Sequence, residues 1–184
     1  MKATIAALVF LLASPAWARS ESWYWGFGLG VGTPTYPAAV QTEVDSVRAA
    51  GGGSTRGAVD LGFHWPVGQT TTLGISGNGG TDSYDLPQDV SVTQSGLFAT
   101  LIHSFGSEPM KGFFLRGDVG LANLRVKTAS VSLTSETGFG LIGGAGIAFA
   151  VSDETKLVLQ ANYAHRRVEG QNYNLFAITF GPMF

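Results

Sequence analysis

Only a few residues of this chain have side chains that can act as acids, bases or nucleophiles. His165 and Glu169 share one face of a predicted strand, because alternate residues of a strand point to the same side, and they could supply a base and an acid. Arg167 lies between them on that face, without the hydroxyl group that an acyl intermediate requires. The chain has no cysteine, so it offers neither a thiolate metal site nor a disulfide framework. We therefore expect no catalytic residues, no cofactor and no metal ion.

In two segments of alternating sequence, polar or small residues occupy every second position and leucine, valine or aromatic residues occupy most positions between them. The polar residues that can carry a charge are Asp60, His64, Arg116 and Asp118. If the apolar parity faces outward, these four side chains face the interior of the fold. Charges in an interior need partners, so we expect the four residues to form a polar network there.

The segments that carry these residues alternate between apolar and small or polar residues, as strands with two different faces do. In the fourth segment we assign Val90, Val92, Phe98 and Ile102 to the apolar face. The eight segments are residues 22–32, 56–65, 70–78, 90–104, 113–126, 136–151, 156–168 and 173–184. Their number and length predict an all-β fold, an eight-stranded antiparallel up-and-down transmembrane β-barrel.

The composition supports strands that face lipid. Charged residues make up only 13% of the chain, and glycine contributes 26 residues, whereas soluble domains carry about 25% charged residues. A secreted barrel of lipocalin type also alternates. However, turning the apolar face inward would leave it a nearly uncharged surface rich in glycine. The net charge of -2 excludes a polybasic surface for nucleic acid.

The first residues have the organisation of a secretory signal. Met1 and Lys2 form a short positive region, residues 3–13 are apolar, and Ala16-Trp17-Ala18 is a cleavage pattern. The apolar run is far shorter than the ~20 residues of a transmembrane helix. We expect residues 1–18 to be a signal peptide and residues 19–184 to be the barrel domain.

The connections between predicted strands alternate in length. They are short after the second, fourth and sixth strands and longer after the first, third and fifth, especially at 33–55 and 79–89. This alternation predicts periplasmic turns, extracellular loops and two periplasmic termini. The loop 33–55 is the best candidate for a surface that binds a ligand. Its Tyr36, Val40, Val44 and Val47 could pack as a short amphipathic piece or contact a partner, but we expect an ordinary disordered loop.

The closing strand carries Phe176, Ile178 and Phe180 on one parity and ends in Phe184. From Gly138 onward the chain reads GFGLIGGAGIAFAVSDETKLVLQANYAHRRVEGQNYNLFAITFGPMF, which resembles the closing half of the small OmpA-type outer-membrane β-barrel family. The opening WYWGFGLG strand is similar to that family as well. The resemblance implies a location in the bacterial outer membrane and implies that the assembly machinery recognises Phe180 and Phe184. It implies no single activity, because the family includes structural proteins, adhesins and small porin-like proteins.

Two lipid A enzymes have this general shape, and the chain departs from both. The deacylase type has a His-x-Ser pair on its penultimate strand, where this sequence reads His165-Arg166-Arg167. The palmitoyltransferase type pairs an Asp-Ser of the second outer loop with a histidine of the first. Asp82-Ser83 is present in the predicted second loop, yet no histidine precedes His64 in the mature chain. We expect a structural or adhesin-like surface protein, with a small channel or a lipid A enzyme as alternatives.

One further partner, lipopolysaccharide, follows from the predicted location. Arg166 and Arg167 lie where the seventh strand leaves the outer leaflet, and a guanidinium there can bind phosphate bidentately. Arg166 and Arg167 are therefore candidates for contact with lipopolysaccharide, and a solvated strand end is the alternative. The interior of an eight-stranded barrel is just wide enough for side chains. The inward glycines of the first and sixth strands suggest loose filling, but a plugged interior is the expectation that we favour over a water-filled one.

Overall fold

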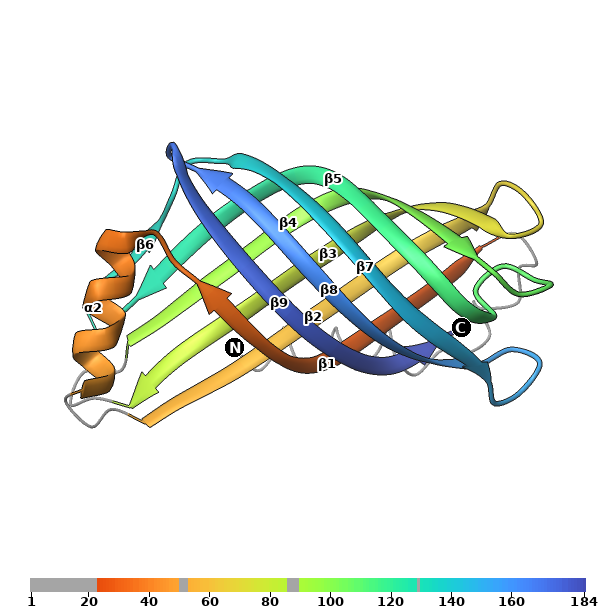
Figure 1. Cartoon of the computed structure of the whole chain (residues 1–184), viewed down its shortest axis with the longest axis horizontal. Coiled ribbons are helices and arrows are strands. Elements are labelled where there is room, and N and C mark those ends of the chain that lie inside the picture. The colour runs from red at the N-terminus through yellow and green to blue at the C-terminus, as the bar shows by residue number, and fades with distance from the viewer. Residues whose placement is uncertain (1–22, 50–52, 86–89, 129) are drawn as a thin grey trace.

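The computed structural model describes residues 23–49, 53–85, 90–128 and 130–184, so the predicted signal peptide lies outside the described residues. Ten elements follow one another along the chain (Figure 1). They are β1 (Tyr24–Thr35), α2 (Ala38–Ala49), β2 (Gly53–Pro66), β3 (Thr71–Asp85), β4 (Val90–Ser104), β5 (Gly112–Lys127), β6 (Ser132–Thr134), β7 (Gly138–Ala150), β8 (Lys156–Val168) and β9 (Gln171–Met183). Within this part of the chain no helix is long and apolar enough to cross a membrane.

Eight of the strands form a closed antiparallel barrel, as predicted. Each strand pairs with the next, β4 pairs with β5, and β1 pairs with β9 to complete the ring. The short β6 pairs only with the end of β5 and forms a hairpin beyond the barrel wall. The start of β1 and the C-terminus lie at one end, the terminal end, while α2 and β6 lie at the other, the loop end (Figure 1).

The register gives the barrel a strong stagger. A row of paired residues that starts at Gly26 runs through β2, β3, β4, β5, β7 and β8 and reaches β9 at Tyr173. Gly26 itself pairs directly with Met183, ten positions further along β9 (173 to 183). A row therefore climbs from the terminal end toward the loop end as it passes around the barrel. Such a stagger accompanies strongly tilted strands, which are visible in Figure 1.

The outer wall of the barrel is apolar. The side chains exposed on it include Leu29, Val59, Ile75, Leu101, Val119, Leu141, Leu159 and Ile178. The predicted parity is correct for most strands but wrong for β4. In that strand Phe98 is only 1% exposed and Ile102 is buried, whereas Leu97 is 61% exposed. Both parities of β4 are apolar, so alternation alone could not assign its lipid-facing side.

Large side chains fill the space that the inward glycines leave. A Cβ atom added to Gly140 would lie 2.8 Å from the ring of Phe98, and one added to Gly146 would lie 2.4 Å from Phe114. Leu175 lies in the same way against Gly80. The expectation of a loosely filled interior was wrong on this point, because Gly80, Gly140 and Gly146 each accommodate a bulky side chain from another strand.

The connection between β3 and β4 is much shorter than predicted. The sequence interpretation placed residues 79–89 in a long outer loop, but β3 continues to Asp85 and β4 begins at Val90. Asp82 and Ser83 therefore belong to a strand, and Asp82 is completely buried. Runs of Gly, Thr and Ser resemble a loop in composition, yet here they form the polar outer part of a long hairpin.

The first long connection contains α2 instead of a disordered loop. Pro37 accepts a hydrogen bond from the backbone of Gln41 at the start of the helix. Val44 is buried, and Val40 and Val47 pack beside it. Spacings of four and three residues place these valines on one helical face.

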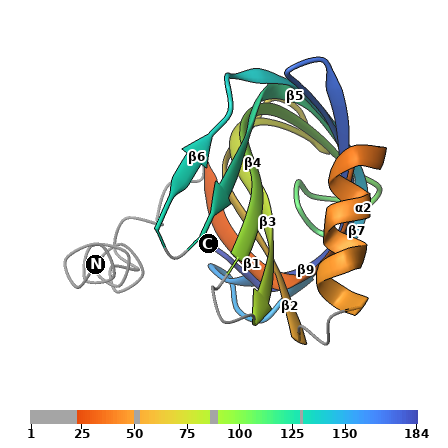
Figure 2. The same cartoon turned by 90° about the vertical axis from the view of Figure 1, so that its left-hand side faces the viewer.

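That helical face covers inward-facing side chains at the loop end. Tyr36 and the helix pack against Tyr84, Val92, Ala122, Val168 and Tyr173, which come from five strands. We call these six buried residues, together with Val44 of the helix, the cap cluster. Figure 2 looks onto this end of the barrel and shows α2 along one side of the opening and β6 on another. The helix therefore closes part of the mouth.

The first and last strands are joined by aromatic and backbone contacts at the terminal end. The rings of Trp25 and Phe184 are stacked with centroids 4.9 Å apart. Their backbones exchange two hydrogen bonds, of 3.0 Å and 2.8 Å. The last residue of the chain is thus part of the closing seam of the barrel.

Candidate functional site

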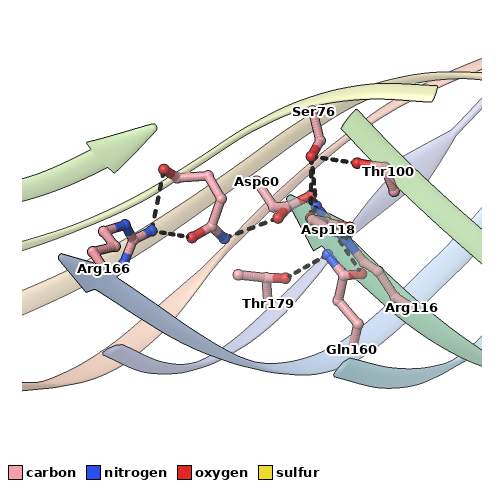
Figure 3. Close-up of polar contacts among 9 residues, drawn as sticks. Asp60, Ser76, Thr100, Arg116, Asp118, Gln160, Arg166 and Thr179 are labelled. Carbon is pink, nitrogen blue, oxygen red and sulfur yellow. Dashed lines mark hydrogen bonds and ion pairs between the residues drawn. The ribbon is translucent and has the colours of Figure 1, made fainter. Parts of the chain in front are cut away.

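The interior of the barrel is organised around the buried guanidinium of Arg116. Its Nη1 donates to Asp60 at 2.8 Å, and its Nη2 donates to Asp118 at 2.7 Å and to Ser76 at 2.8 Å. Asp60, Arg116 and Asp118 are each only 5% exposed. The cation comes from β5 and reaches strands on both sides of the barrel, so it connects the wall across the interior (Figure 3).

Hydrogen bonds extend this centre along the barrel axis. Asn78 donates to Asp60 at 3.0 Å and accepts from Nη2 of Arg166 at 2.6 Å. Arg166 also donates to Gln94 at 3.3 Å. The result is a continuous polar chain from Asp118 through Arg116, Asp60 and Asn78 to Arg166, and Figure 3 labels its four charged members.

Arg166 is a correction to the sequence interpretation. It was a candidate for contact with lipopolysaccharide, but its side chain is 1% exposed and points into the barrel. The strands opposite β8 extend further at the loop end and enclose it. Arg167, the next residue, is exposed on the outer wall, where a contact with lipopolysaccharide stays a prediction.

His64 lies in the same interior. Its Nδ1 atom is buried and has no hydrogen-bond partner, so this atom does not join the polar chain. Its ring occupies the space beside Gly62 and Gly74. The predicted network named Asp60, His64, Arg116 and Asp118, and inward parity also placed Gln160 in the interior. The network omitted Ser76, Asn78, Thr100 and Thr179, which share the inward parity, and that parity was the signal that could have identified them.

A small pocket remains beside this centre. Its volume is about 30 Å³, and Asp60, His64, Arg116, Gln160 and Thr179 supply its polar lining. Such a volume holds about one or two water molecules. Ligand pockets are commonly ~300–1,000 Å³, so this space is too small for an organic substrate.

A second polar group lies below the cap cluster. Asp82 is within 3.4 Å of the guanidinium of Arg56 and accepts a hydrogen bond from Tyr84 at 2.5 Å. Above this pair, the cap cluster excludes water from the mouth with apolar side chains and the rings of three tyrosines. The interior is therefore closed by apolar packing near the loop end and by ion pairs further inside.

The residues considered for catalysis do not assemble. His165 bonds to Asn174 at 2.8 Å on the outer wall of β8 and β9. His103 bonds to Thr71 at 3.1 Å between β3 and β4. Among the described residues, no group of three or more His, Asp or Glu side chains could hold a metal ion.

Comparison with known families identifies the fold independently. The sequence profile described as an outer membrane protein beta-barrel domain matches residues 4–184. No curated protein matches the sequence.

Solved structures share the architecture at low sequence identity. Neisserial surface protein A superposes with a TM-score of 0.62 at 13% identity, covering 88% of this chain and 95% of that one. The attachment invasion locus protein Ail of Yersinia pestis, in complex with the heparin analogue sucrose octasulfate, has a TM-score of 0.57 at 12% identity. That match covers 90% of this chain and all of Ail. Likeness at this level of identity establishes the fold and leaves the activity to be argued from the site.

Proposed function

The chain belongs to the outer-membrane β-barrel family and lies in the bacterial outer membrane, and on that premise we propose that it is a non-enzymatic surface protein. Its role is to bind a partner outside the cell with the elements at the loop end, α2 and the β5–β6 hairpin. The termini then face the periplasm, with residues 1–18 removed as a signal peptide. Phe180 and Phe184 serve as the recognition residues of the assembly machinery.

The filled interior is the observation that carries this proposal. The chain from Asp118 to Arg166 occupies the middle of the barrel, and the cap cluster covers part of the mouth. A barrel filled in this way has no room for a substrate to pass or bind inside. Function is therefore assigned to surfaces that solvent can reach.

Two elements at the loop end present exposed side chains of different character. On α2 the exposed residues include the polar Thr42, Glu43, Asp45 and Ser46. On the hairpin Val131 is 49% exposed and Leu133 is 65% exposed. Exposed apolar side chains in a solvated hairpin are the kind of group that a protein partner buries.

The alternative of a lipid A enzyme is not supported by the placement of its candidate residues. Ser83 and His165 both have outward parity, on β3 and β8 respectively, and four strand-to-strand steps separate these strands. They therefore face different sides of the barrel. We expect lipid A from cells that overproduce the protein to have an unchanged mass, and a change abolished by Ser83→Ala or His165→Ala would contradict the proposal.

The deciding experiment measures attachment of cells that display the protein to surfaces coated with candidate ligands. Ail was crystallised with a heparin analogue, so a sulfated saccharide is one coating and extracellular-matrix protein is another. We expect the double variant V131S/L133S to lose attachment and the variant V67S, altered at an exposed valine of the terminal end, to retain it. A shift in gel mobility between unheated and boiled samples verifies folding of each variant. Equal attachment by all three proteins would overturn the proposed role of the hairpin.

A further inference from the structure

The β5–β6 hairpin ends in a strand with one unpaired edge. On one side β6 pairs with residues 125–127 of β5, and no strand in the described part of the chain pairs with its other side. All three residues of β6 are exposed. In Figure 2 the strand lies at the outer side of the ring of strands. An unpaired edge of this kind can accept a further strand from another chain.

The hydrogen bonds of the hairpin show which backbone groups point to this edge. The backbone N–H of Thr128 donates to the carbonyl oxygen of Val131 at 2.8 Å. In an antiparallel pair, hydrogen-bonded residue pairs alternate with non-bonded pairs. Counted along the register from this bonded pair, Ser132 and Thr134 belong to non-bonded pairs. Their N–H and C=O groups therefore point away from β5 and form the free edge of the sheet.

The space beside this edge lies above the turn between β8 and β9. Both β6 and β7 pair with the same side of β5, and β8 is the next strand after β7. A strand added to β6 would therefore stand in line with β8, which ends at Val168. The lower limit of the space is set by Glu136, whose backbone N–H donates to the carboxylate of Glu169 at 3.0 Å. The acidic groups of this region thus lie at the end of the edge that is nearest to the barrel wall.

One face of the hairpin is cationic. Arg125 and Lys127 share this face with the residues of β6 that they pair with. Nε of Arg125 donates to Oγ1 of Thr134 at 3.3 Å, so the guanidinium extends across β6 toward the free edge. Residues 123–135 include no aspartate or glutamate, and β6 itself carries no charged residue. Both cations are therefore available to a carboxylate brought by a partner.

The opposite face of the hairpin is apolar and exposed. Val131 is 49% exposed and Leu133 is 65% exposed. Side chains of an added strand would alternate between the two faces of the sheet. Those on the face of Arg125 and Lys127 would be matched by acidic residues, and those on the face of Leu133 would be matched by apolar residues.

We propose that the partner of the hairpin is an extended protein segment with acidic and apolar residues at alternate positions, which adds as a strand to the free edge of β6. This inference rests on the proposed function and names the partner class of the same site. Ser132 and Thr134 supply main-chain hydrogen bonds, while the two faces of the hairpin select side chains. A second copy of the hairpin fits less well, because pairing of two β6 strands would place the cations of both copies on one face of the joined sheet.

The test uses the mature chain folded in phosphatidylcholine nanodiscs and a short fluorescent peptide of alternating glutamate and valine. Fluorescence anisotropy measures binding. We expect a peptide of alternating lysine and valine to bind about tenfold more weakly or worse. Methylation of the backbone nitrogens of the glutamate peptide should abolish binding, because it removes the groups that pair with an edge. R125Q/K127Q should lose the preference for glutamate over lysine.

A proline substitution tests the edge itself. Ser132→Pro removes an N–H that β5 does not use and places the proline ring at the edge, where proline is tolerated. It should weaken binding of the glutamate peptide about tenfold. Ser132→Ala is the matched control, because it keeps the N–H and should bind like the unaltered protein. Equal binding by Ser132→Pro and Ser132→Ala would overturn strand addition.

Further outcomes decide the proposal without relying on one variant. Equal binding of the methylated and unmethylated peptides overturns it even if Ser132→Pro fails to fold. Attachment of cells that is lost in V131S/L133S but retained in Ser132→Pro would overturn strand addition and leave the proposed surface role intact. Crosslinking between copies of the protein that Ser132→Pro prevents would also overturn the proposal, because it would assign the edge to a second copy.

Discussion

The positive charges of Arg116 and Arg166 balance the negative charges of Asp60 and Asp118 in the interior of the barrel. Arg116 contacts two carboxylates, Asp60 and Asp118, so this centre alone carries one excess negative charge. Arg166 supplies the compensating positive charge through Asn78, which bonds to both Arg166 and Asp60. The four ionised groups sum to zero, which lowers the cost of burying them.

Removing the central cation should be costly. We expect Arg116→Met to lower the free energy of unfolding by about 3–5 kcal/mol, because Asp60 and Asp118 would remain buried without their partner. Urea unfolding in phosphatidylcholine vesicles, followed by tryptophan fluorescence, measures the change. Lys111→Met is the control: its exposed pair with Glu108 is worth about 1 kcal/mol or less. Equal stabilities of the two variants would contradict the assigned role of Arg116.

The sequence was sufficient to place most interior residues, whereas for Arg166 it left both an inward position and a contact with lipopolysaccharide open. Inward parity identified Asp60, Arg116 and Asp118, because charged residues alternated with apolar ones. Arg166 has the same parity, yet its place at the end of β8 suggested that it had left the barrel. What encloses it is the greater length of β3, β4 and β5 together with the cap cluster. Neither feature can be deduced from the sequence around residue 166.

The strands β1 and β9 leave the least room for a side chain at two of their glycines. A Cβ atom at Gly30 would lie 1.8 Å from the carbonyl oxygen of Ile178, and one at Gly181 would lie 1.9 Å from that of Phe27. No side chain fits at either position unless the two backbones separate. The glycines of this seam are therefore required by packing between the first and last strands.

Alanine substitutions should distinguish this seam from the lipid-facing wall. We expect Gly30→Ala to lower the free energy of unfolding by about 1–3 kcal/mol, because the added methyl group forces β1 from β9. Gly143→Ala is the matched control, since a Cβ there meets nothing within 4 Å. It should be neutral or slightly stabilising, because alanine is less costly than glycine in a strand. Unfolding in urea measures both, and a loss at Gly143 as large as at Gly30 would contradict this explanation.

The helix α2 shows where local sequence is ambiguous. Val40, Val44 and Val47 have helical spacing, but the adjoining prolines and glycines favoured a disordered loop. The helix is stabilised by the apolar floor that Tyr84, Val92 and Tyr173 provide. These three residues come together only when the barrel closes, so the helix depends on tertiary contacts more than on its own propensity.

A charge on the buried face should release the helix from the barrel. We expect Val44→Asp to accelerate tryptic cleavage after Arg48 roughly tenfold to hundredfold, because burial of a valine contributes about 1.5–3 kcal/mol. The barrel should keep its heat-modifiable gel shift. Glu43→Gln, on the exposed side of the same turn, should cleave at the original rate. Equal rates for both variants would mean that α2 is not held by the cap cluster.

For the whole molecule, two barriers in series separate the two ends. The cap cluster closes part of the mouth, and the ion pairs around Arg116 fill the middle. We expect no stable channel conductance from the folded protein in planar bilayers. Val44→Asp should remain closed as well, because the inner barrier persists. Discrete conductance steps from the unaltered protein would instead favour the channel alternative.

The strand count, closure and most faces were predictable because alternation directly reports which side contacts lipid. The fourth strand was the exception. Both faces of this strand are apolar, with Leu97 and Leu101 on one and Phe98 and Ile102 on the other. Phe98 faces the interior because the space beside Gly96 and Gly140 accommodates its ring. Strand length was also underestimated at β3, because its polar outer part faces water or headgroups on one side and the cap cluster on the other.

The contact between Trp25 and Phe184 has a consequence for the timing of assembly. Phe184 is free to be recognised only while β9 is unpaired with β1, since closure stacks its ring on Trp25 and engages its backbone. If the assembly machinery recognises Phe184, pairing of β9 with β1 makes this residue inaccessible to the machinery. The closed barrel then dissociates from the assembly machinery, because Phe184 is no longer accessible. A chain whose β1 and β9 are still unpaired remains bound to the machinery.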